Sequence, residues 1–109
     1  MAKATYWQVG GKIDYTNAGN MKIEHGDIVP IGTRITVAGM DIPAGEKGTL
    51  VTEGIFGVPK AAVEVTLGAT LYFDKTNGNV TTTATDNIPA GWAVEPAGAS
   101  DESIKIKID

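Results

Sequence analysis

Glycine and proline interrupt this chain so often that a long helix cannot form in it. The 109 residues include 14 Gly and 5 Pro, and the longest internal stretch without either runs from Asn79 to Ile88. That stretch holds four threonines, whose branched side chains fit a strand better than a helix. Leucine, a strong helix former, occurs three times, at Leu50, Leu67 and Leu71. We therefore predict an all-β chain.

Alternation of apolar and polar residues supports this prediction and locates the strands. In Ile104–Ile108 three isoleucines alternate with two lysines, and Val63–Leu67 and Arg34–Val37 alternate in the same way. A period of two places the apolar side chains on one face of a strand. Leu71–Asp74 and Val80–Thr83 flank a turn-rich segment that contains Asn-Gly, which favours a β-hairpin.

The expected architecture is a small single-domain β-barrel or β-sandwich with an extended N-terminal arm and little or no helix. At most one turn of helix is expected, near Pro59–Val63. The apolar faces of the predicted strands should supply the core, through Ile28, Ile35, Val37, Leu50, Val63, Val65, Leu71, Phe73, Ile104 and Ile106.

A short motif occurs twice, as Asp41–Gly45 and as Asn87–Gly91, with the shared letters Ile-Pro-Ala-Gly. Proline fixes φ and glycine permits a reversal of the chain, so we interpret the copies as two similar corners of the β structure. A duplicated binding motif is the alternative interpretation.

The first twenty residues differ from the rest, and we expect an N-terminal arm over 1–20 and a β-domain over 21–109. Residues 3–20 contain three of the chain's seven aromatic residues, together with Gly10-Gly11. Adjacent residues of a strand point to opposite faces, so either Tyr6 or Trp7 should face away from the domain. This favours a binding role for the arm, whose candidate partner-binding residues are Tyr6, Trp7, Val9, Ile13 and Tyr15.

The residue types that carry chemistry are sparse. The chain has no cysteine and a single histidine, which excludes ordinary zinc sites and cysteine nucleophiles. Oxygen donors at Asp74, Asn77 and Asn79 suit calcium, but a turn requires the same residues, and their spacing is not that of an EF-hand. We expect no catalytic residue, no metal and no cofactor, and a binding or structural protein in place of an enzyme.

Charge and hydropathy weigh against two classes of partner. The net charge of −4 lacks the basic excess typical of nucleic-acid binding, and the apolar stretches are too short to span a membrane. The first residues contain no apolar segment of the signal-peptide kind, so we expect synthesis in the cytoplasm.

The order of several segments resembles a family of small phage and prophage proteins encoded among head genes, some of which resemble capsid decoration (head-stabilising) proteins. The resemblance lies in Gly26–Val29, Asp41–Gly48 and Gly54–Lys60, and it extends to Ile13–Thr16, Leu71–Asp74 and Gly91–Val94. Trp92 departs from the pattern, because a smaller apolar residue is expected there.

This resemblance implies a non-enzymatic protein that binds the outer surface of a phage capsid shell. Its implied partners are the major capsid protein and two further copies of itself, as a homotrimer at threefold and quasi-threefold positions. It implies a place in the virion after synthesis in the host cytoplasm, with no nucleic-acid or membrane partner, and with Tyr6, Trp7 and Val9 as anchors of the arm.

A small β-sandwich that binds carbohydrate or a cell surface is the alternative function. Exposed aromatic residues form the binding platforms of such modules, and Trp7, Trp92 and Tyr72 are the candidates. Trp92 lies in an apolar segment that we expect to be buried, which argues against this alternative.

Overall fold

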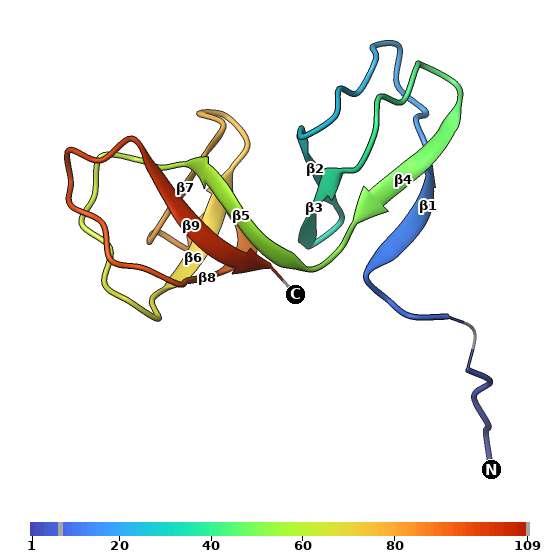
Figure 1. Cartoon of the computed structure of the whole chain (residues 1–109), viewed down its shortest axis with the longest axis horizontal. Coiled ribbons are helices and arrows are strands. Elements are labelled where there is room, and N and C mark those ends of the chain that lie inside the picture. Colours follow the sequence, from blue (N-terminus) through green and yellow to red (C-terminus); the bar gives the residue numbers. More distant parts are fainter. Residues whose placement is uncertain (7, 109) are drawn as a thin grey trace.

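The computed structural model describes residues 1–6 and 8–108, and it confirms an all-β protein without helix in that part of the chain. The described residues contain nine strands, which form two antiparallel sheets in a sandwich-like arrangement, not a closed barrel (Figure 1). The first sheet has the order β1-β4-β3-β2, with β1 (Lys12–Thr16), β2 (Ile28–Ile31), β3 (Arg34–Ala38) and β4 (Lys47–Val51). The second has the order β5-β9-β8-β6-β7, with β5 (Gly54–Pro59), β6 (Thr70–Asp74), β7 (Asn79–Thr81), β8 (Ile88–Ala93) and β9 (Ser103–Ile108).

Two predicted segments of the second sheet, the alternating β9 and the β6–β7 hairpin, behave as expected. In β9 the isoleucines Ile104, Ile106 and Ile108 are buried while Lys105 is exposed. β6 and β7 pair as a hairpin in which Asp74 lies opposite Asn79, across a four-residue loop. The prediction for Arg34–Val37 is also confirmed, because these residues lie in β3.

One local prediction is wrong. Val63–Leu67 forms no strand; its backbone makes a single bridge, between Val65 and Ala97, and then turns, so that Leu67 is 64% exposed. The alternation there reflects one buried residue, not a strand face. Residues 59–63 contain no turn of helix, because Pro59 ends β5 and the backbone of Val63 bonds to Ala61.

The buried apolar residues form two clusters, one for each sheet. The larger cluster lies in the second sheet and includes Ile35 and Val37 of β3, which join the two sheets. The smaller cluster lies in the first sheet around Ile42 and Leu50. All ten residues of the predicted core are buried except Ile28 and Val63, which are half-buried.

The two sheets repeat one pattern of connections. In each, the first strand pairs with the last, and β4, β3 and β2 correspond in order to β9, β8 and β6. Each half also contains an isolated bridge between the segments that precede two of its strands. Ile23 pairs with Ile42 ahead of β2 and β4, and Val65 pairs with Ala97 ahead of β6 and β9. β7 has no counterpart in the first sheet. The chain is therefore an internal repeat of one β unit.

A buried polar side chain stands at the equivalent position of each half. Asn17 follows β1, and its amide donates to the carbonyls of Met21 (2.8 Å) and Ile42 (2.9 Å). Lys60 follows β5, and its ammonium donates to the carbonyls of Ala61 (2.8 Å) and Val63 (2.6 Å). Asn17 is 4% exposed and Lys60 is 6% exposed. Each side chain thus fixes the loop that follows the first strand of its sheet.

This repeat corrects the interpretation of the two Ile-Pro-Ala-Gly motifs. Ile42 of the first motif forms a bridge before a turn, whereas Ile88 of the second begins β8. The counterpart of Ile42 is Ala97, which occupies the same bridge position in the other half. The motifs are therefore not similar corners, and their shared letters serve different backbone conformations.

Candidate functional site

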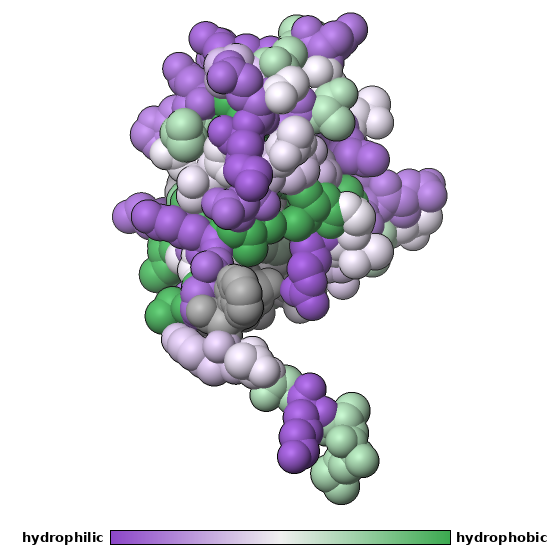
Figure 2. Space-filling view, turned by 90° about the vertical axis from the view of Figure 1, so that its right-hand side faces the viewer, coloured by the Kyte–Doolittle hydropathy of each residue, from purple (hydrophilic) through white to green (hydrophobic). Residues whose placement is uncertain are grey.

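The segment before β1 stands away from both sheets. In Figure 1 it runs from β1 to the N-terminus without approaching another strand, and in Figure 2 it projects from the body as a tail. Tyr6 is 81% exposed and Val9 is 75% exposed. The segment is held at its base, where the N–H of Thr52 donates to the carbonyl of Gly11 (3.0 Å) and the Thr52 hydroxyl donates to that of Gly10.

The other predicted arm residues lie inside the first sheet. Ile13 and Tyr15 belong to β1, where they face Leu50 and Gly48 of β4 and pack half-buried against the smaller cluster. Four of the five candidate residues are thus placed, in two settings: Tyr6 and Val9 are exposed in the segment before β1, and Ile13 and Tyr15 are packed in β1. Trp7 lies outside the described residues.

The N-terminal segment differs from the body in charge. Residues 1–11 contain Lys3 and no acidic residue, so they carry a formal charge of +1 beside the N-terminal amine. The whole chain carries −4, so residues 12–109 carry −5. A cationic, aromatic, exposed segment on an acidic body is suited to bind an apolar and acidic surface.

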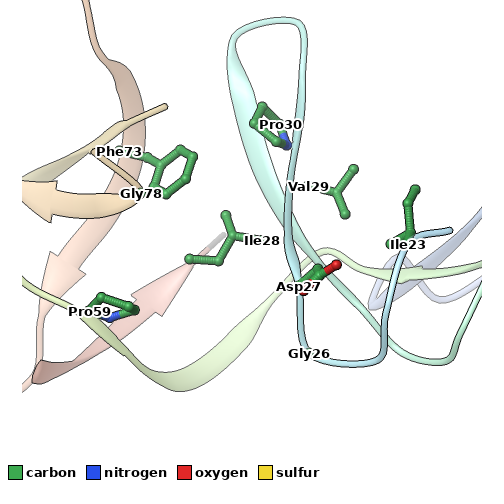
Figure 3. A pocket seen from close by; sticks show the side chains of 9 residues that line it. All are labelled: Ile23, Gly26, Asp27, Ile28, Val29, Pro30, Pro59, Phe73 and Gly78. Atoms are coloured by element: carbon green, nitrogen blue, oxygen red, sulfur yellow. The ribbon is translucent and has the colours of Figure 1, made fainter. Parts of the chain in front are cut away.

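A groove of about 450 Å³ lies beside β2, between the two sheets (Figure 3). Ile28 points across it toward Phe73 and Pro59 of the second sheet, and Asp27 also lines it. The walls are mostly apolar side chains from both halves. Sequence analysis missed this groove because its two walls are distant in the chain and meet only through the packing of β3 on the second sheet.

The polar residues considered for chemistry serve turns. The carboxylate of Asp74 accepts hydrogen bonds from the Asn77 amide side chain (2.7 Å) and from the backbone N–H groups of Thr76 (2.9 Å) and Asn77 (3.2 Å). The Asn77 side-chain bond, followed by these backbone bonds, lowers the pKa of Asp74 below its ordinary value. Asp74 therefore organises the β6–β7 loop, as the turn interpretation requires.

His25 likewise lies in an exposed turn before β2, where its backbone N–H donates to the carboxylate of Asp41 (2.8 Å). No cluster of three or more potential metal ligands occurs among residues 1–6 and 8–108. No helix in this part of the chain is long and apolar enough to cross a membrane.

The expectation that Trp92 is buried is wrong. Trp92 is 39% exposed, because it alternates in β8 with Ala93, whose side chain is fully buried on the opposite face. Tyr72, the other described aromatic residue of the alternative function, is half-buried in β6. The apolar letters around Trp92 reflect a strand with one buried face, which sequence alone does not distinguish from a strand buried on both faces.

A family model described as phage cement protein matches residues 7–108, which is nearly the whole chain. Neither a curated protein nor a solved structure matches the chain.

Proposed function

The chain belongs to the phage cement protein family, and we propose that it is a non-enzymatic decoration protein that binds the outer surface of a capsid shell and stabilises it. The family match over residues 7–108 carries this proposal. The partner is the major capsid protein, and the place of action is the virion. The small all-β body and its exposed N-terminal segment suit a protein that binds to the surface of a shell formed by another protein.

The proposed assembly is a homotrimer at threefold and quasi-threefold positions of the shell. A trimer at such a position touches three neighbouring capsomers at once. Linked contacts raise the overall affinity far above that of one contact, so each subunit needs only a modest interaction. Light scattering over a concentration series tests this part: a stable species of about three chain masses supports it, and a monomer at every concentration removes the preformed trimer.

The proposed contact element of each subunit is the N-terminal arm. Tyr6 and Val9 are exposed and available as anchors, and aromatic residues are enriched where interfaces gain most of their affinity. An extended segment can also add main-chain hydrogen bonds to an exposed strand edge of the capsid protein. Ile13 and Tyr15 would position the base of the arm through their packing in β1.

Co-sedimentation with purified shells tests the proposal. The chain lacking residues 1–9 is the informative variant, because it keeps the Gly10 and Gly11 carbonyls that bond Thr52, and a deletion past residue 11 would begin to remove β1 and its pairing to β4. We expect the full chain to sediment with shells and to saturate, and the truncated chain to lose most of its affinity. Equal binding by the truncated chain would exclude the arm as the contact element, and no binding by the full chain would exclude decoration of that shell.

A further inference from the structure

The chain contains one asparagine that precedes a glycine, and the structure places this pair, Asn77 and Gly78, at the end of the β6–β7 loop. Both residues are exposed, and Gly78 has a φ of +70°. Asparagine before glycine is the sequence most prone to spontaneous deamidation, because glycine has no side chain to hinder attack by its backbone nitrogen. Asn77 is therefore the asparagine of this chain to examine for chemical conversion.

The conversion consists of two steps that need only water. The backbone nitrogen of Gly78 gives up its proton and attacks Cγ of Asn77; the new N–Cγ bond forms, the Cγ–Nδ2 bond breaks, and Nδ2 leaves with a proton as ammonia. Water then opens the resulting succinimide ring at either of its carbonyls, which gives aspartate or isoaspartate. Nothing is oxidised or reduced in either step.

Asp74 holds both groups that take part in the first step. Its carboxylate accepts a hydrogen bond from Nδ2 of Asn77 (2.7 Å), and its backbone carbonyl accepts one from the N–H of Gly78 (2.8 Å). The first bond must break before the Asn77 side chain can turn to the Gly78 nitrogen and release ammonia. The second must break before that nitrogen can lose its proton. A hydrogen bond to a charged group is among the stronger ones, so the folded loop opposes the reaction.

The charge of Asp74 opposes the reaction as well. The hydrogen bonds from Asn77 and Thr76 that lower the pKa of Asp74 keep its carboxylate ionised at neutral pH. Loss of the Gly78 proton and addition to Cγ both place negative charge on atoms of the same loop. Like charges repel, so the Asp74 carboxylate raises the barrier to a reaction that builds up negative charge beside it.

The products would not fit this loop. An aspartate at position 77 has no amide to donate, and its carboxylate would face that of Asp74 where the 2.7 Å bond now lies. An isoaspartate lengthens the backbone of a loop that closes between Asp74 and Asn79. Beyond the loop, Val80 of β7 is fully buried, and its carbonyl accepts the N–H of Ala61 (2.9 Å). A change in the loop therefore reaches the core of the second sheet.

We propose that Asn77 is a modification site of this protein: it converts spontaneously to aspartate or isoaspartate, Asp74 restrains the conversion while the chain is folded, and conversion loosens the β6–β7 hairpin. The inference concerns the lifetime of the folded chain, and it does not depend on the proposed function. Gly78 and Phe73 also line the groove between the sheets (Figure 3), so a converted chain would differ at that surface.

The first test is the rate of conversion at Asn77 in the full-length chain at neutral pH, folded and in urea. Peptide mass spectrometry after digestion in mild acid measures the conversion, and labelling by an isoaspartate methyltransferase identifies the isoaspartate form. We expect the folded chain to convert at least about tenfold more slowly, the factor that one hydrogen bond to a charged group supplies. Equal rates would overturn the restraint, and a rate in urea no higher than that of Asn20, which precedes Met21, would overturn the modification site.

A pair of variants assigns the restraint to one carboxylate. Asp74→Ala removes it, and Asp101→Ala is the matched control, because the Asp101 carboxylate accepts the N–H of Gly98 (2.8 Å) in a different turn. We expect Asp74→Ala to raise the rate at Asn77 several-fold and Asp101→Ala to leave it unchanged, with chemical denaturation showing that both variants are folded under the assay conditions. An unchanged rate in Asp74→Ala, or an equal rise in Asp101→Ala, would overturn the role of Asp74.

A second pair of variants tests the consequence for the hairpin. Asn77→Asp reproduces the aspartate product, and Asn20→Asp adds the same charge at an exposed position outside the hairpin. We expect amide hydrogen exchange in residues 79–81 to rise several-fold in Asn77→Asp and to stay unchanged in Asn20→Asp. Unchanged exchange in Asn77→Asp, or an equal rise in both variants, would overturn the loosening of the hairpin.

Discussion

The packing of Ile42 over Gly48 gives the most specific prediction for stability. A Cβ placed on Gly48 would lie 2.7 Å from Cδ1 and 3.2 Å from Cγ2 of Ile42, and closer still to Cγ1, well inside the usual carbon–carbon contact distance of about 3.5–4.0 Å. Ile42 is fully buried and held by its bridge to Ile23, so it cannot swing into solvent. Gly48→Ala should therefore overpack the smaller cluster.

The expected magnitude follows from this geometry. Overpacking of a core typically costs about 1–3 kcal/mol, and for a domain of this size about 2 kcal/mol lowers the melting temperature by about 10 °C. Ile42→Ala alone should cost about 2–5 kcal/mol, because it removes a buried side chain and leaves a cavity. The double variant should be more stable than the sum of the single effects predicts, by about 0.5–3 kcal/mol, because the added methyl group enters that cavity.

The second half of the chain fills the same two positions in the reverse way. The positions equivalent to Ile42 and Gly48 hold Ala97 and Ile104, so the small and large residues are exchanged, and both lie in one buried cluster. Chemical denaturation followed by circular dichroism measures all three variants. An unchanged free energy of unfolding for Gly48→Ala, or strict additivity in the double variant, would refute this reasoning.

Three further predictions concern single residues. Asp74→Ala should lower the free energy of unfolding at neutral pH. The pKa of Asp74 in the folded chain is lowered from 3.8, so the stabilisation is present above pH 3.8 and is lost as the pH falls through the folded pKa. Chemical denaturation of the two proteins in strong acid should therefore show no difference. Gly91→Ala should cost more than about 3 kcal/mol of stability, because φ at Gly91 is +136° and an added Cβ would lie 2.9 Å from the carbonyl carbon of Lys107. Gly57→Ala is the control, because the space around Gly57 is open, and it should cost under about 1 kcal/mol in the same denaturation assay. Lys60→Met should cost about 1–3 kcal/mol and raise amide hydrogen exchange in residues 61–65, and unchanged exchange there would contradict its role in holding that loop.

Local patterns in the sequence were sufficient for the strands that have one buried and one exposed face. Ile104–Ile108 alternates because β9 contributes one face to the larger cluster, and the Asn-Gly pair locates the β6–β7 hairpin. Arg34–Val37 also forms a strand, although β3 is buried on both faces from Ile35 to Ala38. Val63–Leu67 shows the limit of this reasoning. Its apolar and polar residues alternate as in a strand, yet the segment is a loop that makes a single bridge and buries one residue, Val65.

The internal repeat could not be predicted from the sequence, because the two halves share their backbone hydrogen bonds but have different side chains at equivalent positions. Asn17 and Lys60 perform the same task with different chemistry, and Ile42 and Ala97 occupy the same bridge with different volumes. The letters that do repeat, in the two Ile-Pro-Ala-Gly motifs, belong to positions that are not equivalent.

The exposed surfaces of the chain also differ in how far the sequence predicts them. Tyr6 and Val9 are exposed in a segment that has few apolar residues to pack against. The aromatic residues of the arm were enough to predict it as a candidate binding segment. The shared face of Ile55, Lys107 and Trp92 was not predictable, because it joins strands whose order and register arise only in the folded sheet.

Electron cryomicroscopy of shells incubated with the purified full-length chain tests the central claim most directly. The decoration role predicts added density on the outer surface of the shell, saturating at threefold and quasi-threefold positions, with the N-terminal arm extending into the capsid protein. Shells that remain undecorated at saturating protein, or density confined to the inner surface, would contradict it.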